Sequence, residues 1–159
     1  MQFDKEQLKT QLLTPEQHCQ YKFLAHAEGF AYSGRLKYLQ QCRSVTVAHA
    51  PEYVQHWHHL WNSNDTSPEQ NIVLTPGRNF DALPATIDAL LADDERAERI
   101  ADTSFRYWRR WLAPASIDCY WRRLFGEWAT VQTWEPKITA TMTSYNSFIL
   151  LGKTEWVPY

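Results

Sequence analysis

The sequence is poor in the features that would place it in several special classes of protein. Its 159 residues hold three cysteines, Cys19, Cys42 and Cys119, and no Cys-x-x-Cys pair. This odd, widely spaced set is not a disulfide framework; one bridge plus a free thiol remains open, so the redox compartment is undecided. No apolar run approaches the ~18 residues of a membrane span. The polar N-terminus has no signal-peptide core.

The sequence also lacks a large excess of charge of either sign. The net charge of -2 gives no electrostatic reason to expect nucleic acid or an anionic membrane surface as a partner. The chain contains no Asp-x-Asp pair, so a nucleotide–metal site of that type has no ligands. What is present is an ordinary composition, 44% hydrophobic and 21% charged. Length and composition predict one soluble globular domain.

Two short apolar runs flank a loop that contains two glycines. Residues 21–25 and 44–48 are predicted as buried strands, and Ser33 as the N-cap of a helix that runs to about Cys42. Strand, helix and strand in this order form a βαβ unit with parallel strands and a right-handed crossover. The sequence therefore predicts an α/β fold, a partial Rossmann-like parallel sheet with flanking helices.

The rest of the chain is predicted to be mainly helical. The expected elements are a short helix within 1–13, an aromatic helix over 51–61, a third strand over 71–75, a helix with an apolar stripe from Leu83 to Leu91, a second helix capped by Asp93 or Asp94, and a last helix after Pro114 with a stripe from Ile117 to Trp128. Two β-prone patches, 138–143 and 148–151, follow without a clear partner.

These elements suggest a lead-in at 1–14, a Rossmann-like domain at 15–130 and a tail at 131–159. Three strands are few for a doubly wound domain, and one flank of the sheet would lack a neighbour. We therefore expect the chain to be part of something larger.

The loop and helix start at 28–35 form the best candidate site, because ligands of open α/β sheets bind beyond the carboxyl ends of the strands. Gly29 would permit a tight turn and Gly34 a close backbone approach, while the helix start and Arg35 would hold a phosphate. Glu28 would accept hydrogen bonds from a sugar or ribose hydroxyl. The alternative is a plain capped helix with Arg35 on a solvated face, and spacing alone does not decide between them.

Other chemistry-bearing residues give weaker signals. Five histidines, at positions 26, 49, 56, 58 and 59, lack the cysteine or carboxylate that would complete a zinc set, so unliganded histidines are favoured. Lys22 or Arg43 would add positive charge for a diphosphate. The aromatic and basic runs 108–111 and 120–123 are better explained as buried aromatic stripes flanked by solvated arginines than as a nucleic-acid surface. No residue pattern identifies a nucleophile.

At these positions the chain resembles a known family. The segments that carry the resemblance are 21–24, Glu28-Gly29, Ser33-Gly34-Arg35-Leu36-Lys37-Tyr38-Leu39, 44–47, 71–73, 81–83, 97–101 and 119–124. They are similar to the C-terminal core of glycosyltransferase family 90, the capsule-associated-protein family, which includes protein O-glucosyltransferases and fungal xylosyltransferases. The similarity covers roughly residues 15–129 and is closest to fungal members.

The resemblance implies the C-terminal half of a GT-B glycosyltransferase that transfers glucose or xylose from a UDP-sugar to a hydroxyl of a protein or glycan. Its donor-binding positions are Phe30, Ala31, Tyr32, Ser33, Gly34 and Arg35, with Glu28 and Gly29 before them, and no metal or other cofactor is expected. The acceptor domain and the catalytic base of such enzymes lie N-terminal to this segment, so the catalytic residues are unknown. The family implies the secretory pathway; a chain expressed as it stands would be cytoplasmic.

Three interpretations follow. The first is the donor-binding part of a family 90 enzyme. The second is a truncated, inactive fragment that binds a nucleotide-sugar or serves as a scaffold. The third is a separate module that binds another anion or a protein.

Overall fold

The computed structural model of the protein describes residues 12–77, 80–135, 137, 139 and 142. Its elements are α2 (Pro15–His18), β1 (Phe23–His26), α3 (Leu36–Leu39), β2 (Val45–Ala48), the 3-10 turn η1 (His58–Leu60), β3 (Val73–Leu74), α4 (Leu83–Ala92), α5 (Asp94–Trp111) and α6 (Pro114–Val131). The chain divides into two compact units, residues 1–119 and 120–159. The helix predicted within 1–13 and most of the two β-prone tail patches lie outside the described residues.

The three strands form a parallel sheet in the order β1-β2-β3. Phe23 pairs with Val45 and His26 with Ala48 at the two ends of β1, and Val47 pairs with Val73 across the other side of β2. All four residues of β2 are buried, because this strand has a neighbour on each side and helices above it. The α/β fold with a βαβ unit is therefore confirmed.

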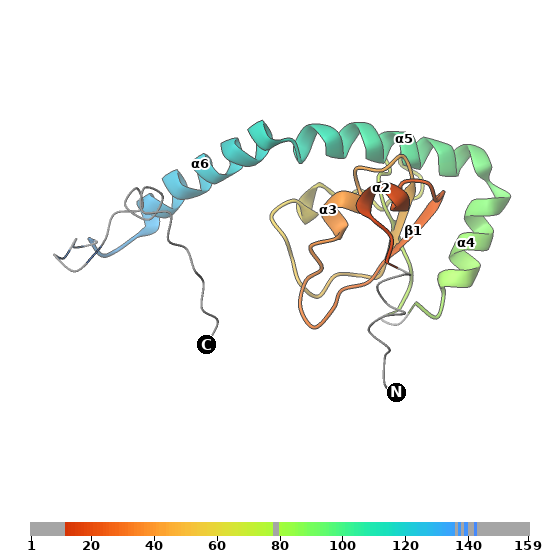
Figure 1. The fold of residues 1–159 in the computed structure, drawn as a ribbon, viewed down its shortest axis with the longest axis horizontal. Coiled ribbons are helices and arrows are strands. Elements are labelled where there is room, and N and C mark those ends of the chain that lie inside the picture. Colours follow the sequence, from red (N-terminus) through yellow and green to blue (C-terminus); the bar gives the residue numbers. More distant parts are fainter. Residues whose placement is uncertain (1–11, 78–79, 136, 138, 140–141, 143–159) are drawn as a thin grey trace. The chain divides into compact units, whose positions relative to one another are not determined.

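The two faces of the sheet have separate apolar clusters. On one face Val45, Val47 and Val73 pack with Leu90 of α4 and Ile100 of α5. Figure 1 shows α4 and α5 running along this side of the sheet. On the other face Leu24, Leu39 and Cys42 form a smaller cluster under α3. Burying an aliphatic side chain of this size contributes about 1.5–3 kcal/mol, so the larger cluster dominates the stability of the fold.

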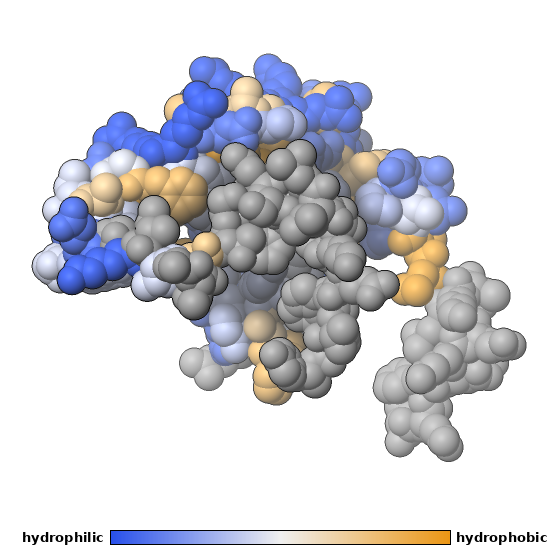
Figure 2. Space-filling view, turned by 60° about the vertical axis from the view of Figure 1, so that its left-hand side comes forward, coloured by the Kyte–Doolittle hydropathy of each residue, from blue (hydrophilic) through white to orange (hydrophobic). Residues whose placement is uncertain are grey.

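The amphipathic pattern of α5 explains how it lies on the sheet. Its buried residues, at positions 97, 100, 101, 104 and 108, share one face. Asp93 caps its start by accepting a hydrogen bond from the Arg96 amide at 3.0 Å, so the predicted cap is confirmed. Hydrophilic side chains gather along the upper edge of the molecule in Figure 2, where Figure 1 places α5.

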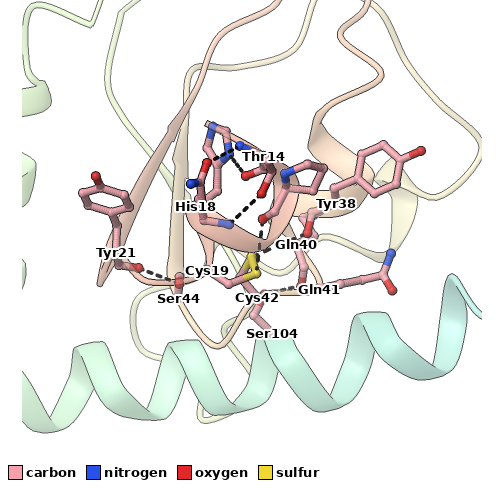
Figure 3. The surroundings of a disulfide bond; sticks show 12 residues. Thr14, His18, Cys19, Tyr21, Tyr38, Gln40, Gln41, Cys42, Ser44 and Ser104 are labelled. Atoms are coloured by element: carbon pink, nitrogen blue, oxygen red, sulfur yellow. Dashed lines mark hydrogen bonds between the residues drawn. A yellow bond between two sulfur atoms is a disulfide. The ribbon is translucent and has the colours of Figure 1, made fainter. Parts of the chain in front are cut away.

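A disulfide joins Cys19, just after α2, to Cys42, just after α3 (Figure 3). Beside it the Ser44 hydroxyl donates a hydrogen bond to the Tyr21 carbonyl at 2.7 Å. Cys119 is a free, exposed thiol. The cysteine question left open by the sequence is thus settled as one bridge plus one thiol, and the bridge encloses β1, the candidate loop and α3.

Two predicted helices are shorter than expected. α3 is a single turn, whereas the sequence suggested a helix from Ser33 to about Cys42. In the segment 51–61 only the three residues of η1 are helical. Here the Trp57 indole donates a hydrogen bond to the buried Gln40 side chain at 3.1 Å. Tertiary contacts of this kind outweigh a weak local preference for helix.

The last helix, α6, has no buried residue. The aromatic residues of its predicted stripe are open to solvent: Trp121 is 43%, Phe125 65% and Trp128 60% exposed. The expectation of a buried aromatic stripe at 120–123 is therefore wrong for this structure. The spacing of these aromatic residues still places them on one face of the helix.

Candidate functional site

Two loops meet at the carboxyl edge of the sheet. Residues 27–35 follow β1 directly, and residues 49–57 follow β2. Because β1 and β2 are parallel and His26 is in register with Ala48, the two loops leave the sheet side by side. This edge is where the sequence placed the candidate site.

Glu28 connects the two loops. One carboxylate oxygen accepts a hydrogen bond from the Glu52 amide at 2.8 Å, and the other accepts one from the Tyr53 amide at 3.0 Å. The Tyr53 hydroxyl in turn donates to the Phe30 carbonyl at 3.2 Å. Glu28 was predicted to accept hydrogen bonds from a ligand hydroxyl; in this structure both of its oxygens already hold backbone N–H groups.

His49 adds a fourth link and has a defined tautomer. The Glu28 amide donates to His49 Nε2 at 3.3 Å, and His49 Nδ1 lies 2.8 Å from the Ala50 carbonyl. An amide N–H only donates and a carbonyl oxygen only accepts, so Nε2 is unprotonated and Nδ1 carries the hydrogen.

His26 is a buried, neutral histidine beneath the same loops. Its side chain is only 4% exposed, and Nδ1 has no hydrogen-bond partner among the described residues. Burial, followed by the positive charge of Arg35, lowers the pKa of His26 to about 4. His49 and His58 act in the same direction, while Glu28 opposes them. The site therefore has a neutral imidazole under Arg35 at physiological pH.

His58 is a second histidine of this region with a perturbed pKa. Burial lowers the pKa of His58, and the charge of Glu28 partly offsets that effect. Its ring stacks on Trp61 with centroids 4.1 Å apart, and neither ring nitrogen has a hydrogen-bond partner in the described part of the chain. Within that part, no group of three or more His, Cys, Asp and Glu side chains is arranged to hold a metal ion.

Arg35 is exposed at this edge and forms no ion pair with a described carboxylate. It lies close enough to His26 for its charge to shift the pKa of that histidine. The two cations that were expected to add positive charge beside Arg35, Lys22 and Arg43, do not lie at this edge. Lys22 pairs with Asp94, and Arg43 pairs with Asp102 and with Glu98, at the amino-terminal ends of β1 and β2. These two cations are therefore at the wrong edge of the sheet.

The remaining predicted site residues form an open loop. Phe30 is fully exposed and Tyr32 is 58% exposed, while Ala31 and Gly34 also face solvent and Ser33 is half-buried. The structure thus brings the whole predicted set onto one accessible segment. An open cavity of about 500 Å³ lies beside it, lined by Tyr32 and by the residues Glu52, Tyr53, Val54, Gln55 and His56.

Three details of the predicted phosphate loop need correction. The Ser33 side chain does not cap α3, whose N-cap is Arg35. Gly29 and Gly34 do not have positive φ, and a Cβ added at either position would lie 4.0 Å from its nearest neighbour outside the adjoining residues. Glycine is therefore not required at either position. A one-turn helix also has only a small dipole, so Arg35 and the loop backbone remain as the groups able to hold an anion.

Sequence reasoning missed His26, His49 and Tyr53 as parts of the site. A usable signal existed, because parallel strands end at the same edge and place residues 49–53 beside residues 27–30. The hydrogen bonds of the Glu28 carboxylate could not be predicted from the sequence, because their donors are backbone amides, which every residue type except proline provides.

An open parallel sheet whose polar loops meet at its carboxyl edge defines a ligand-binding type of α/β protein. Comparison with known families gives the particular family: a match to Glycosyl transferase family 90 covers residues 1–154. The chain therefore belongs to glycosyltransferase family 90.

Several curated relatives are O-glucosyltransferases by name. The chain is 29% identical over 122 residues to the O-glucosyltransferase rumi homolog of Aedes aegypti, covering 77% of this chain and 29% of that protein. It is 30% identical over 113 residues to the Anopheles gambiae homolog, covering 70% and 27%. It is 26% identical over 120 residues to human Protein O-glucosyltransferase 1, again covering 70% and 27%. The chain thus spans less than a third of the relatives it matches.

None of the described helices is both long and apolar enough to span a membrane.

Proposed function

We propose that this chain is the donor-binding part of a family 90 glycosyltransferase. The complete enzyme transfers a sugar, glucose or xylose, from a UDP-sugar to a hydroxyl of a protein or glycan acceptor. Family membership and the names of the relatives support glycosyl transfer, with glucose favoured over xylose. The acceptor site and the catalytic base come from the part of the enzyme outside this segment.

The observation that carries the donor role is the unpaired Arg35 guanidinium at the carboxyl edge. A guanidinium offers a planar fork that matches phosphate oxygens and keeps its charge at every physiological pH. The neutral His26 beneath it adds no second positive charge and no competing anion. We propose that Arg35 stabilises the diphosphate of the leaving UDP without a metal ion.

The cavity beside Tyr32 suits the uncharged portion of such a donor. Glu52 is its only lining residue with a full charge, and burial lowers the pKa of the sixth lining residue, His56, which keeps that ring neutral at pH 7. A diphosphate is not favoured next to a carboxylate, whereas hydroxyl groups and rings are accommodated by tyrosine, glutamine and glutamate side chains. The charged and uncharged parts of a UDP-sugar thus have separate places at this edge.

Calorimetric titration with UDP tests the proposal. We expect weak binding that is the same with Mg²⁺ and with EDTA, and a loss of at least about ten-fold in affinity in Arg35→Ala, because a charge-assisted bidentate contact is removed. Arg43→Ala is the matched control, since this arginine is held in ion pairs at the other edge. Equal affinity of the wild type and Arg35→Ala would reject the site assignment.

The alternative is an inactive fragment or scaffold. A chain that binds UDP but transfers no sugar to an acceptor protein, even when mixed with the remaining part of a family 90 enzyme, would favour it.

The disulfide supports an oxidising compartment. Structural disulfides persist in secreted proteins and in the secretory pathway and are rare in the cytosol. We propose that the protein works in the secretory pathway, in preference to the cytoplasmic location expected for a chain expressed as it stands. Non-reducing mass spectrometry of the native protein, with the Cys19–Cys42 peptide pair found linked, is the expected result.

A further inference from the structure

The candidate loop has no anchor in either apolar cluster. None of residues 27–35 is buried, and only Glu28 and Ser33 are half-buried. Within the loop one backbone hydrogen bond, from the Gly29 amide to the Ala31 carbonyl at 3.0 Å, is formed. A segment with so little buried surface is held by its polar contacts to neighbouring segments.

Those polar contacts converge on Glu28. It supplies three of the four hydrogen bonds between the two loops: two through its carboxylate to the Glu52 and Tyr53 amides, and one through its own amide to His49. The fourth joins the Tyr53 hydroxyl to Phe30. Hydrogen bonds to an ionised carboxylate are about twice as strong as those between neutral groups, so the two carboxylate contacts dominate the set.

We propose that Glu28 is a positioning residue of the donor site, whose carboxylate latches the 28–35 loop to residues 49–53. This inference rests on the proposed function, because it assigns the latch a role in donor binding. The latch fixes the loop that carries Arg35 and keeps Tyr32 in the lining of the cavity that it shares with residues 52–56. Glu28 acts on the donor through the loop, with its oxygens occupied by backbone amides and not by the ligand.

The latch is tested first in the free protein, by amide hydrogen exchange measured residue by residue with NMR. In Glu28→Gln we expect the Tyr53 amide to exchange at least about ten-fold faster, because a charged acceptor is replaced by a neutral amide that presents a single oxygen. Glu52→Gln is the matched control: it removes the same charge from the same edge but keeps the backbone amide of residue 52. Unchanged Tyr53 exchange in Glu28→Gln would overturn the latch.

The effect on the donor is tested by titration with UDP. We expect Glu28→Gln to bind UDP about ten-fold more weakly, and Glu69→Gln, which removes one exposed carboxylate outside the two loops, to bind as the wild type does. Tyr53→Phe removes the link to Phe30 without changing Glu28, and we expect a loss of about three-fold in the same direction. An unchanged affinity in Glu28→Gln would overturn the positioning role.

The two measurements separate the possible failures. If the wild type does not bind UDP, the proposed function fails, while the exchange experiment still decides whether the latch exists. If Glu28→Gln loses UDP binding but Tyr53 exchange is unchanged, Glu28 contacts the donor directly and the latch is wrong. Faster exchange that is absent in Glu52→Gln, together with weaker UDP binding that is absent in Glu69→Gln, is the result that supports the proposal.

Discussion

Acidification is the perturbation that tests the buried His26 most directly. The pKa of this group is about 4 in the folded protein and 6.5 in its ordinary range. Folding therefore favours the neutral ring: the stabilisation is fully present above pH 6.5 and is lost as the pH falls from 6.5 towards 4.

The size of the effect follows from the shift in pKa. Each pKa unit corresponds to about 1.4 kcal/mol, so the shift predicts a loss of about 3 kcal/mol well below pH 4, of which about 2 kcal/mol is lost by pH 5. The groups that act on this ring are Arg35, His49, Glu28 and His58. All four groups remain in a His26→Gln variant, so their own titration contributes equally to both proteins and cancels in the comparison.

The assay is urea unfolding at pH 7 and pH 5, followed by tryptophan fluorescence. We expect the wild type to lose about 2 kcal/mol more than His26→Gln between these two pH values. His59→Gln, which changes an exposed ring, should behave as the wild type does. Equal losses in the wild type and His26→Gln would show that His26 is not held neutral, and would refute the reasoning from burial and from the charge of Arg35.

Three further changes test the scaffold, each by urea unfolding at pH 7. Cys19→Ser should lower the free energy of unfolding by roughly 3.4 kcal/mol, the loop-closure value for a separation of 23 residues, whereas Cys119→Ser should have little effect. Asp93→Ala should cost about 1 kcal/mol, because the start of α5 loses its cap. Trp57→Phe should cost about 1–3 kcal/mol beyond the lost contact area, since the buried Gln40 oxygen loses its donor. A loss in Cys119→Ser as large as that in Cys19→Ser, or no loss in the other two, would contradict the contacts described.

The parallel sheet and the long helices were predictable because their signals are local. β-Branched and aromatic runs mark β1 and β2, and the spacing of Ala97, Ile100, Ala101 and Trp108 marks the buried face of α5. The cap at Asp93 also depends only on residues next to it in sequence. These features require no knowledge of distant contacts.

The errors arose where distant contacts decide the local structure. The segment 51–61 places the amides of Glu52 and Tyr53 on Glu28 and the indole of Trp57 on Gln40, and these contacts leave only one 3-10 turn. In α6 the pattern of Trp121 and Phe125 gives the direction of an apolar face but not what covers it. The local sequence carries little information about the distant contacts of segment 51–61 or about the surroundings of the apolar face of α6.

For the candidate site, too, local features could be predicted from the sequence and distant contacts could not. Parallel strands fix the edge at which ligands of such sheets bind, so the sequence alone is enough to propose the segment 28–35 and Arg35 as a candidate site. The exclusion of Lys22 and Arg43 required the structure, because each lies before its strand and is paired with a carboxylate of α5. The neutral state of His26 also depends on burial, which no motif encodes.

The bond between Cys19 and Cys42 makes the candidate loop, residues 28–35, part of a covalent ring. Arg35 and Lys37 are exposed within this ring, and trypsin cleaves the peptide bond that follows an arginine or a lysine. A chain cleaved after either residue therefore keeps both pieces attached and migrates as one molecule until the disulfide is reduced. Cleavage here therefore opens the candidate loop without releasing either piece, so an unchanged mass of the unreduced protein does not show that this loop is intact.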